Sequence, residues 1–119
     1  MNENNVIVEK SKAFALRVIK LHLYLTDKKR EYVMSKQLLR CGTSIGANVK
    51  EAIRAQSTPD FYAKMNISLK EASEAEYWLE LLYESDLIEK VAFDSIYADC
   101  QEVLRILMAI TKKQKAATK

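Results

Sequence analysis

The residues best suited to catalysis or metal binding are few in this chain of 119 residues: one histidine and two cysteines. His22 lacks the Glu-x-x-His pairing of di-iron bundles, because Ile19 stands three residues before it. Cys41 and Cys100 are too far apart along the chain to resemble a zinc motif. We therefore predict no catalytic residue, no metal site and no cofactor.

Two weaker catalytic signals also favour a structural interpretation. Residues 42–46 read Gly-Thr-Ser-Ile-Gly, but they lack the Gly-Lys-Ser/Thr ending of a phosphate loop and no strand precedes them. Distance alone leaves a Cys–His nucleophilic pair open. Cys100, however, lies on an apolar helix seam, and buried cysteines are usually inert. An enzyme is accordingly the third-ranked hypothesis.

An uncharged belt at residues 41–49 is unusual for a bundle helix, which normally carries Lys or Glu on its outer face. Both glycines of the protein, Gly42 and Gly46, lie in this belt, one helical turn apart. Each costs about 1 kcal/mol relative to alanine within a helix, whereas small residues at this spacing let another helix approach closely. We expect a neighbouring helix, in the same or another subunit, to bury the belt.

A second feature is a set of polar residues that helical spacing places on facing surfaces of two helices. They are Arg40, Ser44, Asn48 and Glu51 on one helix and Glu71 and Glu74 on the next. We predict that Arg40 pairs with Glu74, or failing that with Glu71. A structural network or subunit interface is the favoured interpretation of this set, and a ligand-binding site is the alternative.

Basic residues cluster at two places, and either cluster could attract phosphates without sequence preference. The clusters are Lys28, Lys29 and Arg30, and Lys112, Lys113 and Lys115. Residues 1–56 carry 11 Lys/Arg and 5 Asp/Glu, whereas residues 57–119 carry 8 and 11. This asymmetry favours steering of a partner or docking of subunits, although ordinary scatter on solvated helix faces explains it equally well.

The elements that position these residues are predicted to be long helices, because the chain contains two Gly and one Pro, too few for the turns of a β-rich fold. Apolar periodicity places them at about 9–26, 31–55, 57–85 and 90–114. The first helix has a main stripe of Ala13, Leu16, Ile19 and Leu23, widened by Phe14, Val18, Leu21 and Leu25. The other seams are Leu38, Gly42, Ile45, Val49 and Ala52; Phe61, Met65, Ser68, Ala72, Ala75, Leu79 and Leu82; and Phe93, Ile96, Cys100, Val103, Leu107 and Ile110.

The predicted fold is therefore all-α, an antiparallel up-down-up-down four-helix bundle. We expect one domain over residues 1–119, with an ordered core at about 9–114. No apolar run is long enough to span a bilayer, the first ten residues do not resemble a secretory signal, and cysteine usage suits a reducing cytoplasm. A cytoplasmic location without membrane association is the expectation.

Two long runs resemble the signatures of the 23S rRNA intervening-sequence protein family. Residues 35–52 read SKQLLRCGTSIGANVKEA and residues 69–82 read LKEASEAEYWLELL. The resemblance extends from about Lys10 to Lys113. It implies a bacterial four-helix bundle that assembles as a ring-shaped homopentamer. A similar accessory protein of diversity-generating retroelements is more basic and engages nucleic acid and a reverse transcriptase.

Together these features predict a non-catalytic binding or scaffold protein that self-associates, with a pentamer favoured. RNA or an RNA-associated protein is the favoured partner. The alternative is an oligomeric scaffold that binds only protein. No small-molecule substrate is evident.

Overall fold

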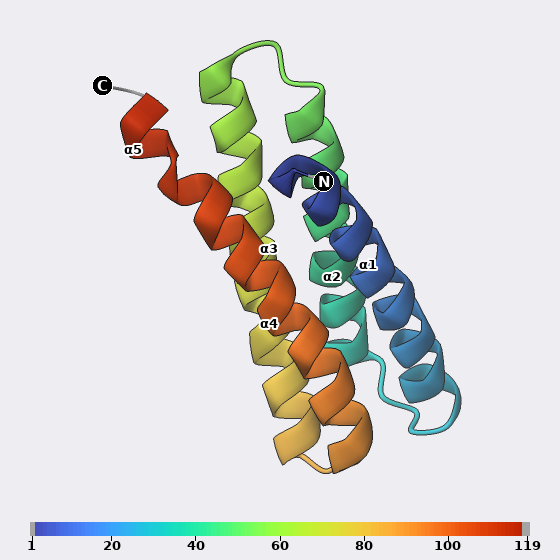
Figure 1. Ribbon diagram of the computed structural model, residues 1–119. Coiled ribbons are helices and arrows are strands. Elements are labelled where there is room, and N and C mark those ends of the chain that lie inside the picture. The colour runs from blue at the N-terminus through green and yellow to red at the C-terminus, as the bar shows by residue number, and fades with distance from the viewer. Residues whose placement is uncertain (1, 118–119) are drawn as a thin grey trace.

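The computed structural model describes residues 2–117, and these residues form four long antiparallel helices, one short helix and no strand (Figure 1). The long helices are α1 (Glu3–Asp27), α2 (Val33–Ile53), α3 (Thr58–Glu84) and α4 (Lys90–Lys112), and α5 (Gln114–Ala117) follows α4. Each long helix packs on its neighbours in the order α1–α2–α3–α4, and α4 also contacts α1. The predicted all-α four-helix bundle is confirmed.

Local capping residues explain where several helices begin and end. The Asn2 side chain accepts a hydrogen bond from the Asn5 N–H, which starts α1 earlier than residue 9, where the periodicity placed it. Ser57 does the same for Asp60 at the start of α3. α3 ends in a Schellman motif: Asp86 has a φ of 64°, and the Leu87 N–H donates to the Leu82 carbonyl over 2.9 Å.

The core is a single apolar cluster to which all four long helices contribute. The seams predicted on α2, α3 and α4 lie in it, except that Phe61 and Phe93 at their ends are only partly buried. Ser68 is also fully buried, and its hydroxyl donates to the Ile45 carbonyl over 2.9 Å, so this polar group carries no desolvation penalty. These seams bind the helices into one bundle.

The predicted main stripe of α1 is wrong. Leu16 and Leu23 are 54% and 58% exposed, Ile19 is 38% exposed, and Ala13 is also exposed. The side chains that fill the core come instead from the neighbouring stripe, namely Ile7, Phe14, Val18 and Leu25. Both stripes have helical spacing, and only the positions of the other helices decide between them.

The bundle is elongated, with principal extents of 49 × 22 × 21 Å. The α1–α2 loop lies at one end, whereas the N-terminus of α1 and the last turns of α4 lie at the other (Figure 1). No helix within residues 2–117 is both long and apolar enough to cross a membrane.

Candidate assembly and nucleic-acid surfaces

The two glycines of the uncharged belt pack against α1 of the same subunit. A Cβ placed on Gly42 would lie 2.8 and 2.9 Å from the two γ-methyl carbons of Val18, which is closer than real contacts allow. A Cβ on Gly46 would meet Ser11 Oγ at 3.4 Å, an ordinary contact. The close approach predicted for the belt therefore occurs within the bundle, and it is Gly42 that permits it.

The belt is only partly covered by this packing. Cys41, Gly42, Ile45 and Val49 are buried, and Thr43, Ser44, Gly46 and Asn48 are partly buried, whereas Ala47 is exposed. The expectation that a neighbouring helix buries the whole belt is therefore not met by this subunit alone. Its outer side forms a shallow groove between α1 and α2, lined by Val8, Lys12, Ala15, Thr43, Ala47 and Lys50.

The structure places Arg40 between the two carboxylates predicted as its partners. Its guanidinium lies 3.3 Å from Glu71 Oε2 and 3.2 Å from Glu74 Oε1, and it also donates to Gln37 Oε1 over 3.4 Å. The Arg40 side chain is 51% exposed and that of Glu71 is 13% exposed. Burial, followed by the neighbouring Glu74 charge, raises the pKa of Glu71 above its ordinary value, and Arg40 partly offsets this.

The rest of the predicted polar set does not bridge the helices as one network. The Ser44 hydroxyl donates to the Arg40 carbonyl, and the Asn48 amide donates to the Ser44 carbonyl, so both satisfy hydrogen bonds inside α2. Glu51 forms a separate ion pair with Lys64 of α3 at 3.5 Å. Gly42 and Gly46 belong to the α1–α2 contact, on another side of the helix.

The two basic clusters lie at opposite ends of the bundle, so they do not form one patch (Figure 1). At the α1–α2 loop, Lys28 lies 3.6 Å from Asp27, whereas Lys29 and Arg30 are exposed and form no ion pair within residues 2–117. At the other end, Lys113 pairs with Glu3, and Lys112 and Lys115 are exposed. In the loop cluster, Lys29 and Arg30 are thus the cations left without an ion pair among residues 2–117.

The two cysteines and the histidine, the residues with the most reactive side chains, lie in the core or at a contact between helices. Burial raises the pKa of both the Cys41 and the Cys100 thiols to about 12, which keeps them protonated at neutral pH. The His22 ring places Nδ1 2.5 Å from Ser35 Oγ at the α1–α2 contact. No group of three or more His, Cys, Asp or Glu side chains in the described part of the chain is arranged to hold a metal.

Sequence reasoning missed an aromatic stack that fixes the α3–α4 contact. Tyr83 and Phe93 are stacked with ring centroids 4.4 Å apart, and Phe93 and Tyr97 follow at 4.7 Å. The Tyr97 hydroxyl donates to Glu80, which raises the pKa of the tyrosine. The sequence signal that could have predicted this stack is the spacing of Phe93 and Tyr97 by one helical turn.

A family profile gives the chain its place among known proteins. The profile of the 23S rRNA-intervening sequence proteins matches residues 3–109. The chain belongs to this family. The resemblance found in the two sequence runs is therefore confirmed.

A solved structure supports the same family assignment for this chain. A protein of unknown function from the S23 ribosomal protein family of Bacteroides thetaiotaomicron is 49% identical to it, with a TM-score of 0.91. The match covers 93% of this chain and 99% of the other. No curated protein matches the chain. Membership therefore establishes the family and the fold, and the biochemical role is a matter for proposal.

Proposed function

We propose that this protein is a non-catalytic scaffold that self-assembles and presents its α1–α2 loop to RNA. The observation that carries the assembly is the apolar outer stripe of α1. Leu16, Ile19 and Leu23 recur at spacings of three and four residues and remain 54%, 38% and 58% exposed. Apolar side chains gathered on one exposed helix stripe are suited to burial against a partner.

The positions of the reactive side chains support a scaffold over an enzyme. The two thiols are buried with raised pKa values, and His22 contacts a core serine. In the described part of the chain, no buried side-chain polar atom lacks a hydrogen-bond partner, as expected of a structural core. The family resemblance favours five copies arranged in a ring.

RNA is the proposed ligand of the assembly because Lys29 and Arg30 are exposed at one end of the bundle and have no ion pair among residues 2–117. One copy offers too few charges for tight binding. An assembly repeats the loop around its symmetry axis, and avidity then rises without a new type of contact. Binding of this kind should weaken steeply with salt and show little sequence preference.

Assembly is tested by light scattering coupled to size-exclusion chromatography over a micromolar concentration series. The wild type should elute as an oligomer, and Leu16→Glu with Leu23→Glu should dissociate it. The control is Val91→Glu on α4, because Val91 is 84% exposed and lies outside the stripe. A wild type that stays monomeric throughout the series would refute the scaffold proposal.

RNA binding is tested separately by fluorescence anisotropy with a structured RNA at about 50 mM salt. Reversing Lys28, Lys29 and Arg30 to Glu should abolish binding and leave the oligomer intact. Reversal of Arg54, which is exposed at the opposite end of the bundle, serves as the control. An oligomer that binds no RNA, or binds equally well after the reversal, favours the scaffold that binds only protein.

A further inference from the structure

The cations of α1 and α2 divide into those that are paired within the bundle and those that are not. Neither residues 10–26 nor residues 32–50 contain an acidic residue, and together they contain seven Lys or Arg. Lys10 pairs with Glu102, Arg17 with Asp99, and Arg40 with two helix α3 carboxylates. The remaining four have no ion pair within residues 2–117 and are exposed: Lys12, Lys20, Lys36 and Lys50.

These unpaired lysines surround the apolar stripe on the outer side of α1 and α2. On α1, Lys12 continues the spacing of Leu16, Ile19 and Leu23, and Lys20 lies one turn from both leucines. On α2, Lys36 and Lys50 share a side with Thr43 and Ala47, and this side borders the groove that Lys12 also lines. We call this surface the basic face: Lys12, Leu16, Ile19, Lys20, Leu23, Lys36, Ala47 and Lys50.

The opposite side of the bundle has the reverse charge. Residues 71–102 contain ten Asp or Glu and one Lys. Glu76, Glu80 and Glu84 follow one another at four-residue intervals along α3, and none has a cationic partner among residues 2–117. Glu76 accepts a hydrogen bond from Gln101 and Glu80 accepts one from Tyr97, both on α4. The three carboxylates therefore follow the seam between α3 and α4.

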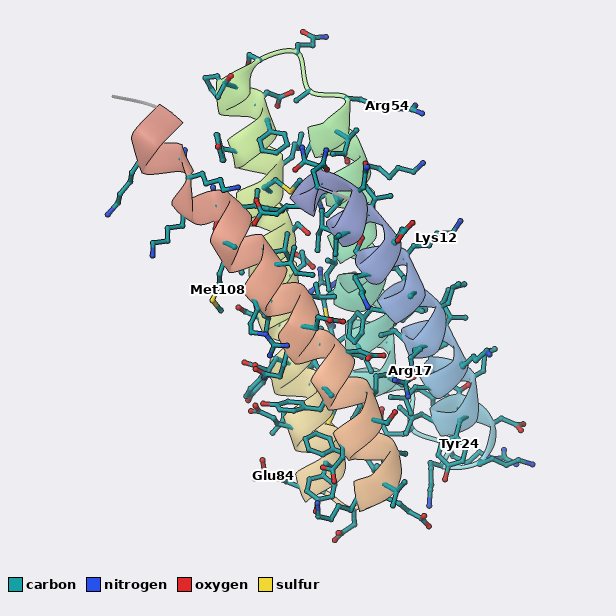
Figure 2. All side chains as sticks on the ribbon, viewed as in Figure 1. Lys12, Arg17, Tyr24, Arg54, Glu84 and Met108 are labelled. Carbon is teal, nitrogen blue, oxygen red and sulfur yellow. The ribbon has the colours of Figure 1, made fainter. Side chains whose placement is uncertain are left out.

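Exposed apolar side chains accompany these carboxylates. Tyr77 is 55% exposed and Met108 is 52% exposed. We call this surface the acidic face: Glu76, Tyr77, Glu80, Glu84 and Met108. Figure 2 shows Lys12 and Tyr24 at the α1 edge of the molecule and Met108 and Glu84 at the opposite edge. Each copy thus has two different charged surfaces with apolar centres, pointing in opposite directions.

We propose that the basic face of one copy docks on the acidic face of the next, so that the contact between copies is head-to-tail. This inference rests on the proposed self-assembly and specifies its geometry. Two basic faces, or two acidic faces, would repel each other, whereas the head-to-tail contact gives the unpaired lysines their missing carboxylates. Such a heterologous contact leaves one face open on each end copy, and growth stops only when a ring closes.

The size and chemistry of the faces suit a second copy of the chain. The bundle measures 49 × 22 × 21 Å, so one long side supplies roughly the 800 Å² that each partner contributes to a stable interface. RNA could neutralise the lysines, but it would leave the leucines of the stripe uncovered. RNA would also leave Glu76, Glu80 and Glu84 without partners. RNA bound to the basic face is therefore an alternative that the experiment must detect.

The test uses two charge-reversed variants of the full chain, followed by sedimentation velocity alone and after mixing. The first variant has Lys12→Glu, Lys20→Glu and Lys36→Glu, which makes both faces acidic. The second has Glu80→Lys and Glu84→Lys, which makes the other face basic. Each variant alone should associate at least about tenfold more weakly than the wild type. Mixing them should restore association, because each junction between the two variants again joins opposite charges. Strict alternation cannot close a ring of five, so the mixed species should be an even-numbered ring or an open chain.

A matched control reverses Lys10 and Lys64 to Glu, as many charges as the second variant reverses. Both side chains are paired within the bundle, with Glu102 and Glu51, and neither belongs to a face. Circular dichroism verifies folding. If a reversed variant does not fold, Lys→Gln and Glu→Gln replacements at the same positions should still weaken association. The proposal is overturned if the second variant alone assembles like the wild type, or if mixing restores nothing. It is also overturned if the first variant loses only RNA binding. A monomeric wild type would instead refute the proposed function.

Discussion

Replacing Gly42 with alanine should destabilise the protein, although alanine is the better helix former. Gly42 is buried on α2, and its would-be Cβ lies 2.8, 2.9 and 3.2 Å from Val18 Cγ1, Cγ2 and Cβ. Carbon atoms pack best at about 3.5–4.0 Å. Val18 is fully buried on α1, and a β-branched side chain in a helix has one strongly preferred rotamer, so it cannot rotate away. The two helices would have to separate.

The magnitude follows from two opposing effects. Alanine gains about 1 kcal/mol in helix propensity over glycine. Overpacking of a filled core costs about 1–3 kcal/mol. The expected result for Gly42→Ala is a net loss of up to about 2 kcal/mol in the free energy of unfolding. Gly46→Ala is the matched control, because its Cβ would meet Ser11 Oγ at 3.4 Å in ordinary contact. That variant should gain up to about 1 kcal/mol.

The assay is urea unfolding followed by circular dichroism, with all variants at one protein concentration because self-association also contributes to stability. Val18→Ala provides a further check, since it removes the γ-methyl carbons that a Cβ on Gly42 would strike. The double variant should be more stable than the sum of the single losses by about 1 kcal/mol. If Gly42→Ala is as stable as Gly46→Ala, the close α1–α2 contact does not determine stability and the reasoning fails.

Three further predictions concern charges and thiols. Arg40→Ala should lower the free energy of unfolding by roughly 1 kcal/mol, which is more than the loss for Lys36→Ala. The loss should be smaller than for a fully buried ion pair, because the Arg40 side chain is 51% exposed. Equal unfolding free energies for the Arg40 and Lys36 variants would contradict this prediction. The thiols of Cys41 and Cys100 have pKa values of about 12, against an ordinary value of 9.0. Iodoacetamide should therefore alkylate them on the order of 10³-fold more slowly in the native protein than in denaturant. Equal rates of alkylation, measured by mass spectrometry, would exclude their burial. The pKa of Glu71 is raised above 4.5 in the native protein, so its contribution to stability should decline as the pH rises from 4.5 through the native pKa. Glu71→Gln should flatten this part of the plot of unfolding free energy against pH, with each free energy measured by urea unfolding. An unchanged slope in the variant would contradict the prediction.

Much of the fold was predictable because three helices carry one apolar stripe each. Seams such as Leu38 to Ala52 on α2 have a single side that could face a core, and the structure buries them there, apart from Phe61 and Phe93 at the ends of the other two seams. The Arg40 contact was also foreseeable. Helical spacing restricts which side chains can project from one helix toward another, and Glu71 and Glu74 were the carboxylates within reach.

By itself, the sequence determined the helix class, the bundle order and the unequal distribution of charge, because spacing, turn scarcity and charge counts are properties of a linear chain. It could not choose between the two stripes of α1, since Leu16 and Val18 belong to equally periodic patterns. Only packing decides that choice: Gly42 admits Val18 into the contact between α1 and α2, and Leu16 is thereby turned outward among unpaired lysines. Which charges remain unpaired depends in the same way on which helices meet, and that is a property of the tertiary structure alone.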